Sequence, residues 1–343
     1  MYKFCKQLQS SVYFGFDTLV HCCSCDLDRT PTFIHYYRGQ RINWKAVINE
    51  KLKLQEKAKK GKAPFSACAN CHSFVEDEWD NGGYINEITV SHWTKCNCDC
   101  FYCYTARNKT DSNKRTPYPL LPLLQDMKNA GILRFDGIIR FLGGDVAMLD
   151  EFEDFMRFFL DNGAKNFYIP TSGIKYLPVI SEVLEQGKGE VIISPDSGNR
   201  NLYKKIKRID AYNLVRENMK KYAQSATIGN SVFRSKYLVL PYINDKKEYI
   251  DEWLQECIDL NIKYIADDIE DNFSAKYKKS IPEHIPELLN YIHQKADKYG
   301  LNKVRFRYAS QMLYEIQNGT AKIAKNNLNY NNQKIFMEKL LNR

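Results

Sequence analysis

The sequence predicts an α/β fold, a barrel of six βα repeats that carries a small cysteine-rich N-terminal subdomain. From Tyr84 onward, strand-like apolar runs alternate with helical patterns, which implies parallel strands joined by right-handed crossovers. The first 83 residues lack this alternation and hold six of the eleven cysteines. A length of 343 residues suits one such barrel with an appendage.

Residues 1–83 form the predicted N-terminal subdomain. The alternating run S-V-Y-F-G-F-D-T-L-V-H-C, with a tight turn at Gly15–Asp17, predicts a β-hairpin. A basic amphipathic helix is expected from about Trp44 to Lys60, and a glycine and a proline end it before the cysteine pair C-A-N-C. Two successive glycines then mark the boundary to the barrel.

Residues 84–308 form the predicted barrel, and residues 309–343 a polar C-terminal tail with a short helix near 335–341. The strands are expected at the apolar runs 85–93, 137–142, 166–170, 190–194, 235–240 and 263–266. Helical patterns follow them at 120–130, 150–161, 176–186, 211–223, 248–260 and 282–299. A last strand-like piece is expected at 303–308. Functional side chains should gather at the carboxyl ends of the strands.

The bulk properties argue against a membrane protein and indicate a reducing compartment. No run of 18 apolar residues exists and the N-terminus lacks an apolar signal region, so we expect a cytoplasmic protein without a membrane span. An odd number of cysteines, bunched in the sequence, then favours metal binding over disulfides. The net charge of +9 is modest. Basic runs at Lys51–Lys62 and Lys204–Arg208 are expected to be solvated helix surfaces, and without a nucleic-acid-binding module we expect no nucleic-acid partner.

The cysteine loop after the first strand is the strongest chemical signal. In W-T-K-C-N-C-D-C-F-Y-C-Y-T, from Trp93 to Thr105, Cys96, Cys100 and Cys103 have the spacing C-x3-C-x2-C. Thiols this crowded are more often metal or redox groups than packing. Three thiolates hold three irons of a cubane cluster and leave the fourth iron open for a ligand. The crowding therefore predicts metal or redox thiols, and this spacing suits three ligands of such a cluster. Cys98 lies outside the spacing, and we assign it no ligand role.

A zinc site is the competing interpretation of these thiols. Cys68 and Cys71 form a C-x2-C pair, as do Cys100 and Cys103, and two such pairs are a common structural zinc signature. The gap of 28 residues between the pairs exceeds the usual ~15–20. It also leaves the C-x3-C spacing unexplained.

The cysteine loop, with aromatic Tyr102 before its last cysteine, resembles the cluster loop of the radical S-adenosylmethionine (radical SAM) enzymes. The resemblance extends from Ile85 to about Tyr308 and implies a partial (β/α)6 barrel of the TIM type. It also implies that the three cysteines of the motif hold a [4Fe-4S] cluster and that S-adenosylmethionine (SAM) binds its open iron beside Tyr102. Reduction of the cluster then cleaves SAM to a 5′-deoxyadenosyl radical, which abstracts a hydrogen from the substrate. A reductant protein such as flavodoxin or ferredoxin is the implied partner.

Three further phrases resemble the SAM-binding parts of that family. After the second strand, two glycines let the backbone approach a ligand with free amide groups, and the phrase G-G-D resembles the G-G-E motif that contacts the methionine amino group. The phrase S-P-D-S-G-N after the fourth strand resembles the segment that contacts the ribose. Asp196 and Ser197 in this phrase also suit a turn that caps the next helix. The fifth strand resembles the segment beside the adenine. The residues assigned to SAM in this way are Gly143, Gly144, Asp145, Ser194, Asp196, Leu238 and Leu240.

The N-terminal cysteines resemble the auxiliary-cluster segments of SPASM and twitch domains. Their pattern C-x(9–15)-G-x4-C is matched at Cys5 and Cys22, with aspartate in place of the glycine, and a C-x2-C pair follows at Cys68 and Cys71. The resemblance implies a second [4Fe-4S] cluster held by these four cysteines. Cys23 and Cys25 are alternatives to Cys22.

The sequence thus predicts a radical SAM enzyme with one catalytic and one auxiliary cluster. Auxiliary clusters of this kind occur in relatives that modify peptides and in relatives that oxidise small hydroxylated molecules, so a substrate of either class is expected. Asp267, Asp268 and Glu270, after the sixth strand, are candidate catalytic carboxylates by position alone. The alternative function is a zinc-stabilised interaction protein whose basic helix binds an acidic partner.

Overall fold

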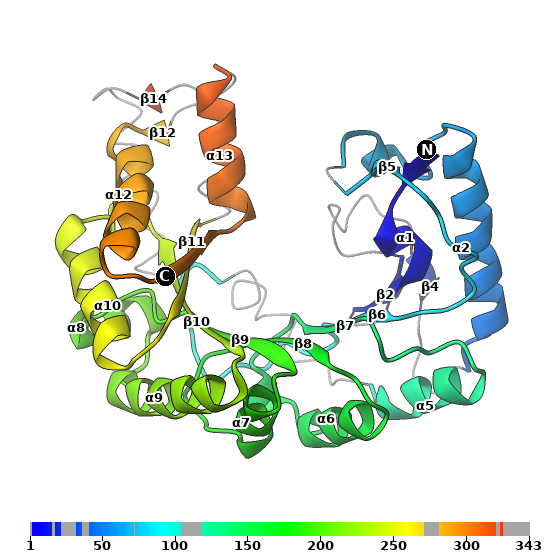
Figure 1. Ribbon diagram of the computed structural model, residues 1–343, viewed down its shortest axis with the longest axis horizontal. Helices are drawn as coiled ribbons and strands as arrows, with labels where there is room; N and C mark the ends of the chain where they lie inside the picture. The colour runs from blue at the N-terminus through cyan, green and yellow to red at the C-terminus, as the bar shows by residue number, and fades with distance from the viewer. Residues whose placement is uncertain are drawn as a thin grey trace. The chain divides into compact units, whose positions relative to one another are not determined.

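The computed structural model describes residues 2–15, 18–21, 32–35, 41–71, 73–103, 118–270, 281–319 and 323–324 (Figure 1). The chain forms two compact units. The first, here the N-terminal unit, comprises Met1–Lys95 and Asp111–Ile169, and the second, the C-terminal unit, comprises Cys96–Thr110 and Pro170–Arg343. The chain therefore passes from one unit to the other immediately before the first cysteine of the predicted cluster loop.

The sheet of the N-terminal unit mixes parallel and antiparallel strands in the order β8-β7-β6-β2-β3-β4. The strands from β8 to β2 are parallel, whereas β3 is antiparallel to β2 and to β4. β2 pairs with β6, so the cysteine-rich N-terminal segment extends the sheet at the first barrel strand. The bounds are β2 Ser11–Phe14, β3 Thr18–Val20, β4 Thr32–His35, β6 Glu87–Val90, β7 Ile138–Phe141 and β8 Asn166–Thr171, whose last two residues belong to the C-terminal unit.

The N-terminal segment contains the predicted hairpin and the predicted basic helix. β2 and β3 form the hairpin, in which the amide of Gly15 donates to the carbonyl of Thr18 at 2.9 Å. Helix α2 spans Trp44–Lys59, but it is not a uniformly solvated surface: Lys51 is 2% exposed and its Nζ donates to the carbonyl of Leu8 at 3.1 Å. The other elements are β1 Tyr2–Phe4, α1 Lys6–Ser10, η2 Ser66–Asn70 and β5 Val75–Asp77, which pairs antiparallel with β1.

Two helices of the N-terminal unit follow the predicted pattern, α5 at Leu121–Asn129 and α6 at Phe152–Asp161. In α6 the apolar face is fully buried, and Phe159 packs edge-on against Phe167 of β8 with ring centroids 6.4 Å apart. Burying an aromatic side chain of this kind contributes roughly 1.5–3 kcal/mol. This face of α6 therefore helps to hold the parallel strands in place.

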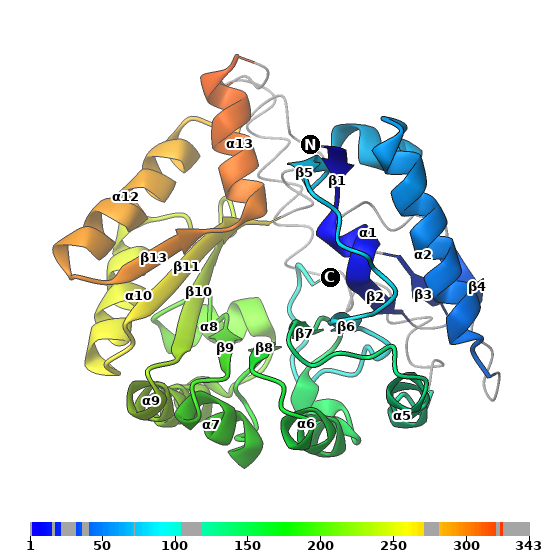
Figure 2. The same cartoon turned by 45° about the vertical axis from the view of Figure 1, so that its right-hand side comes forward.

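The sheet of the C-terminal unit is parallel throughout, in the order β13-β11-β10-β9 (Figure 2). Burial alternates along β10, because Phe233, Ser235 and Tyr237 point to the helices. Trp253 of helix α10 (Lys247–Asp259) shows this, since its Nε1 donates to Ser235 Oγ at 2.8 Å. The alternate residues, Lys236 and Leu238 among them, lie on the opposite face. The strands are β9 Gly189–Ile193, β10 Val232–Val239, β11 Tyr264–Ile269 and β13 Asn302–Arg305.

Two helices of the C-terminal unit lie outside the predicted helical patterns. Helix α8 contains most of the basic run that was expected to be a helix surface, but its bounds were not predicted because it is short and has only three apolar residues. Helix α13 begins at Arg307, inside the expected strand 303–308, and crosses the expected boundary at 308. The predicted helix near 335–341 lies outside the described residues. The helices are α7 Pro178–Glu185, α8 Arg200–Lys207, α9 Tyr212–Gly229, α10 Lys247–Asp259, α12 His284–Lys298 and α13 Arg307–Gln317, and the short strands β12 Ile281–Pro282 and β14 Ile323–Ala324 pair with each other. In the described part of the chain no helix combines the length and apolarity that a membrane crossing needs.

Candidate functional site

The cysteine loop opens the C-terminal unit. Cys96 is exposed, Cys100 and Cys103 are half-buried, and Cys98 is buried. The amide of Cys103 donates to the carbonyl of Cys100 at 3.0 Å, and the amide of Cys98 donates to Sγ of Cys96 at 3.4 Å. The three cysteines of the predicted motif thus keep access to solvent, whereas the fourth is enclosed.

Hydrogen bonds inside the loop favour a thiolate at Cys100. The hydrogen bond from the Cys98 thiol lowers the pKa of Cys100 to about 7 against the effect of burial, and the charge of Lys207 acts in the same direction. The same hydrogen bond, with a second one to Cys96 and with burial, raises the pKa of Cys98. Because iron binds the thiolate form, the loop presents a sulfur prepared for a metal at Cys100.

Asp196, which follows β9, connects the cysteine loop to β10. Its carboxylate is fully buried: Oδ2 accepts hydrogen bonds from Tyr102 Oη and Lys207 Nζ, both at 2.5 Å, and Oδ1 accepts from the amide of Leu238 at 2.9 Å. Its φ of 57° is left-handed, a conformation that aspartate tolerates better than most residues. Donors of the protein itself thus use both carboxylate oxygens. The capping role that the sequence left open for Asp196 is taken by Asn199, whose side chain accepts from the first amides of α8.

Asn244 organises the ends of β9 and β10, although nothing in the sequence singled it out. Its side-chain amide donates to the carbonyls of Asp196 at 3.0 Å and Leu238 at 2.9 Å, and its Oδ1 accepts from the amide of Leu240 at 2.7 Å. Leu238 is half-buried and Leu240 is buried, while Ser194, directly after β9, is half-buried. The structure therefore brings these predicted SAM contacts to the carboxyl ends of two adjacent parallel strands.

The G-G-D segment lies in the N-terminal unit, against the residues that lead into the cysteine loop. The amide of Gly144 donates to the carbonyl of Trp93, and that of Asp145 to the carbonyl of Lys95, each at 3.0 Å. A Cβ at Gly144 would lie 2.0 Å from the Lys95 carbonyl oxygen, and one at Gly143 would lie 2.6 Å from that of Trp93. The amide of Gly144 is thus not free, contrary to the expectation, and the glycines permit the close approach of two backbone segments.

The N-terminal cysteines partly converge. Cys5 and Cys68 are 5% and 4% exposed and share one buried cluster with Leu8, flanked by the rings of Phe65, Phe74 and Trp79. Cys71 is half-buried, and its amide donates to the carbonyl of Cys68 at 3.2 Å. Cys22, Cys23 and Cys25 lie outside the described residues. Two of the four predicted auxiliary ligands, Cys5 and Cys68, therefore lie together. Cys71 follows directly at the end of η2, the short helix that contains Cys68.

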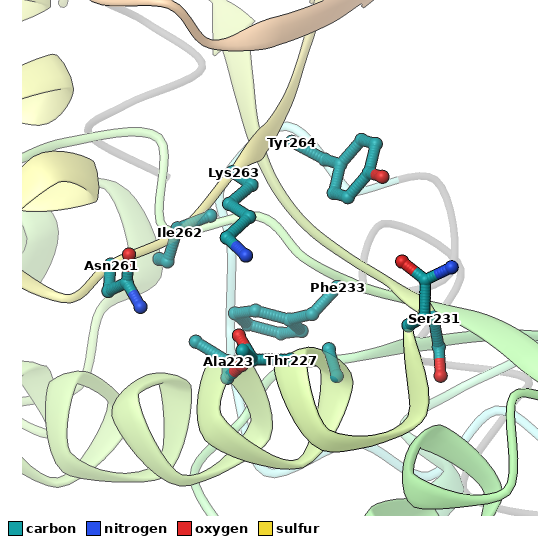
Figure 3. A pocket seen from close by; sticks show the side chains of 10 residues that line it. Ala223, Thr227, Ser231, Phe233, Asn261, Ile262, Lys263 and Tyr264 are labelled. Atoms are coloured by element: carbon teal, nitrogen blue, oxygen red, sulfur yellow. Dashed lines mark hydrogen bonds between the residues drawn. The ribbon is translucent and has the colours of Figure 1, made fainter.

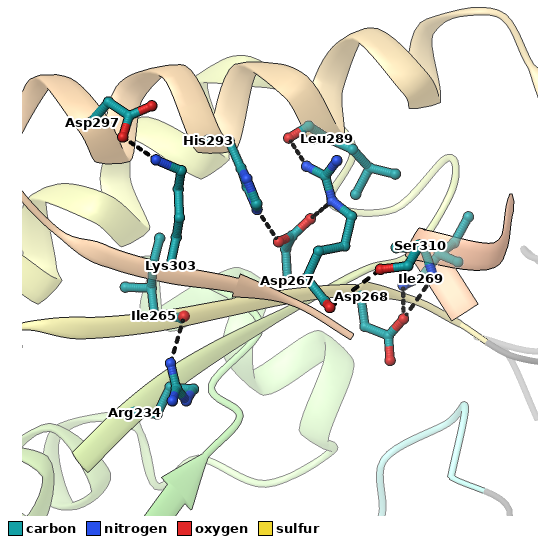
Figure 4. Close-up of polar contacts among 12 residues, drawn as sticks. Arg234, Ile265, Asp267, Asp268, Ile269, Leu289, His293, Asp297, Lys303 and Ser310 are labelled. Atoms are coloured by element: carbon teal, nitrogen blue, oxygen red, sulfur yellow. Dashed lines mark hydrogen bonds and ion pairs between the residues drawn. The ribbon is translucent and has the colours of Figure 1, made fainter. Parts of the chain in front are cut away.

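Neighbouring carboxylates of β11 point to opposite faces of the sheet (Figure 4). Asp267 is 2.7 Å from Nε2 of His293 on α12 and 2.8 Å from Nε of Arg305 on β13, so it ties three elements together. Asp268 accepts from the amide of Ala309 at 3.0 Å, and burial raises its pKa. Asp267 therefore has a structural role, while Asp268 shares the face of Lys236 and Leu238. Glu270 is buried directly after β11.

A small cavity of about 40 Å³ lies at the amino ends of β10 and β11 (Figure 3). Phe233, Lys263 and Tyr264 are among its lining residues. It has room for a few water molecules at most. Because Ser194 and Leu238 lie at the opposite ends of the strands, this cavity is separate from the candidate site.

The donor chemistry of the cysteine loop fits an iron–sulfur cluster. Within the described ranges, no three His, Cys, Asp or Glu side chains are gathered closely enough to hold a single metal ion. The loop instead offers three accessible thiols, one with a lowered pKa and one whose sulfur already accepts a backbone amide. Thiolates with hydrogen bonds to sulfur are the usual setting of such clusters.

Part of the chain is similar to a known family. Residues 90–254 match the family model of the radical SAM superfamily. The probable GTP 3',8-cyclase of Methanocaldococcus jannaschii is 24% identical over 141 residues, which are 41% of this chain and 46% of that protein. The GTP 3',8-cyclase of Clostridium botulinum is 25% identical over 175 residues, 51% of this chain and 53% of that protein. The chain spans about half the length of the curated relatives it matches.

Solved structures share the fold. Streptococcus suis SuiB bound to the precursor peptide SuiA superposes with a TM-score of 0.52 at 13% sequence identity, over 79% of this chain and 64% of that chain. SuiB bound to S-adenosylmethionine gives a TM-score of 0.50 at 13% identity, over 80% and 58% of the two chains. These likenesses confirm the predicted α/β class with a mostly parallel sheet.

Proposed function

We propose, from the radical SAM domain that this chain contains, that it is an enzyme that cleaves SAM reductively and directs the resulting radical to a hydrogen of its substrate. The domain covers residues 90–254 and therefore includes the cysteine loop. Radical SAM enzymes use a [4Fe-4S] cluster and SAM. The observation that carries the proposal is the C-x3-C-x2-C loop, with three accessible thiols and a lowered pKa at Cys100.

In this proposal Cys96, Cys100 and Cys103 hold the cluster, and three thiolates leave one iron open for SAM. The cluster, when bound and reduced, supplies the electron that splits the sulfonium and yields the 5′-deoxyadenosyl radical. The residues of the chain bind and orient the cofactor. Asp196 and Asn244 set the positions of the groups around it, because both bond to backbone at the end of β10. The residues that we assign to SAM are Tyr102, Gly143, Gly144, Asp145, Ser194, Asp196, Leu238 and Leu240.

We propose a peptide or a small hydroxylated molecule as the substrate. A precursor peptide is bound to SuiB, which supports the first class, and the GTP 3',8-cyclases point to a nucleotide within the second. An external reductant such as flavodoxin or ferredoxin would supply the electron. Parallel incubations with a peptide library and with GTP, each followed by mass spectrometry, separate the two classes.

The test of SAM cleavage compares two cysteines of one loop. The protein is purified and reconstituted anaerobically, reduced with dithionite and assayed for 5′-deoxyadenosine. Cys100→Ala should abolish its formation, whereas Cys98→Ala, the matched control, should retain it. Normal formation by the Cys100 variant would overturn the ligand assignment. Zinc in place of iron and sulfide in the wild-type protein would instead support the zinc-stabilised interaction protein.

We also propose that the N-terminal segment holds a second [4Fe-4S] cluster, ligated by Cys5, Cys22, Cys68 and Cys71. The shared cluster of Cys5 and Cys68 supports it, because it brings two of the four proposed ligands together. Four thiolates leave no open iron, so this cluster would transfer electrons or, after loss of one ligand, bind substrate.

The second cluster is tested by removing the first. A chain with alanine at all three cysteines of the loop motif is reconstituted anaerobically. It should keep about four irons and a cluster absorption band while it loses all SAM cleavage. A folded triple variant without iron would remove the second cluster and leave the first proposal intact.

A further inference from the structure

Helix α8 holds the cysteine loop through its last carbonyls. A helix C-terminus leaves carbonyl groups without intrahelical partners. Here the carbonyl of Ile206 accepts from the amide of Phe101 at 3.3 Å, and the carbonyl of Lys207 accepts from the amide of Asp99 at 3.1 Å. The loop backbone between the predicted ligands is thus paired with the end of one short helix.

The side chain of Lys207 binds the same loop from inside the protein. Lys207 is 4% exposed, although it lies in the basic run 204–208 that the sequence predicts to be solvated. Its Nζ donates to Tyr102 Oη at 2.7 Å and to Asp196 Oδ2 at 2.5 Å. Although burial disfavours the ammonium, the charges of Asp196 and Cys100 raise the pKa of Lys207 well above its usual value. The ammonium is therefore a permanent charge in this interior.

The partners of Lys207 connect the loop to the predicted cofactor site. Tyr102 belongs to the cysteine motif, and Asp196 follows β9. The other oxygen of Asp196 accepts from the amide of Leu238 on β10. One buried cation thus joins three chain segments, all within the C-terminal unit, and its helix also holds the loop backbone.

We propose that Lys207 is a positioning residue, which fixes the cysteine loop through Tyr102 and its own carbonyl and fixes Asp196 against β10. The inference rests on the proposed function, because the loop it positions is the predicted cluster site. Replacing a buried ion pair by apolar groups is often neutral for stability, whereas removing one partner leaves a buried charge without compensation. Replacing Lys207 and replacing Asp196 by neutral residues therefore change the charge near the proposed cluster in opposite directions.

The first measurement does not need SAM turnover. Hydrogen–deuterium exchange of peptides covering 96–103 is followed in the reconstituted protein. Lys207→Met should speed exchange at these amides about ten-fold, because the loop loses a hydrogen bond to a charged group. Lys205→Met, an exposed lysine on the same helix, is the matched control and should leave exchange unchanged.

The second measurement is the reduction potential of the catalytic cluster. Net charge near a cluster sets its potential, so Lys207→Met should make the potential more negative and Asp196→Asn should make it more positive. The double variant should return toward the wild-type potential while its loop still exchanges faster. Lys207→Arg should restore both properties in part. The KM for SAM should rise more than kcat falls in Lys207→Met, because the change concerns position and not chemistry.

These measurements test the proposed function and the positioning role of Lys207 separately. If the wild-type protein forms no cluster, the proposed function fails, and the exchange data still test the loop contact. If wild-type cleaves SAM but the loop exchange and the potential of Lys207→Met equal those of wild-type, the positioning role is wrong. If Lys207→Met does not fold, the double variant decides, because it buries no unpaired charge: wild-type exchange in that variant would overturn the inference.

Discussion

His92 makes the stability of the protein depend on pH. It is 1% exposed and packs against the rings of Trp93, Tyr118 and Phe155, with ring centroids 5.0–6.1 Å apart. Within the described residues neither ring nitrogen of His92 has a hydrogen-bond partner. Burial therefore lowers its pKa from 6.5 to about 4. The perturbation that we consider is His92→Phe, which keeps a ring and removes the titration.

The sign of the pH dependence follows from the lower proton affinity of His92 in the folded protein than in the unfolded chain. Because the folded pKa of His92 lies below the unfolded value, the contribution of neutral His92 is fully present above about pH 6.5 and is lost as the pH falls toward 4. The difference between 6.5 and about 4 corresponds to about 3 kcal/mol of unfolding free energy. At pH 5.5 the loss is already about 1 kcal/mol.

Chemical denaturation under anaerobic conditions at pH 7.5 and pH 5.5 measures this loss. The fall in unfolding free energy between the two pH values should be about 1 kcal/mol smaller in His92→Phe than in wild-type. Tyr118→Phe is the matched control from the same cluster: it removes the hydrogen bond to the carbonyl of Gly15 and should lower stability equally at both pH values. An unchanged pH dependence in His92→Phe would falsify the assignment of a buried neutral histidine.

Two further predictions concern stability. Gly144→Ala should cost at least about 2 kcal/mol in thermal unfolding, because its Cβ would lie 2.0 Å from the Lys95 carbonyl oxygen. Gly163→Ala, whose Cβ meets nothing within 4 Å, should cost only the strain of alanine at a φ of 85°, about 1 kcal/mol. Equal losses in the two variants would contradict the steric argument. Asp267→Asn should destabilise the protein by roughly 3 kcal/mol in denaturant titration, because Arg305 and His293 lose a buried partner. The SAM cleavage activity of the folded fraction should persist. A variant that is stable but inactive would return Asp267 to the catalytic candidates.

The sequence by itself determined the fold class and most of the elements, and it predicts the chemistry of the loop. Alternating apolar runs place strands and helices because their periods are local properties of the chain. The spacing of Cys96, Cys100 and Cys103 is also local, so it indicates a cluster site without knowledge of the fold. Where the local pattern was weak, the prediction was incomplete or wrong: the bounds of helix α8 were not predicted, because it has only three apolar residues in a basic run, and α13 begins where a strand was expected.

Only the tertiary structure decided which buried polar side chains support the candidate site. The lysine of a basic run looks solvated in sequence, yet Lys207 is buried because Asp196, eleven positions away, and Tyr102, more than a hundred positions away, supply its partners. Asn244 likewise gains its role from three backbone groups that meet only in the folded C-terminal unit. The glycines of the G-G-D segment were expected to leave free amides, but the amide of Gly144 donates to Trp93, and Gly143 and Gly144 lie close to the backbone of Trp93 and Lys95. Burial and hydrogen bonding between distant segments depend on packing, and packing is not encoded in any single stretch of the chain.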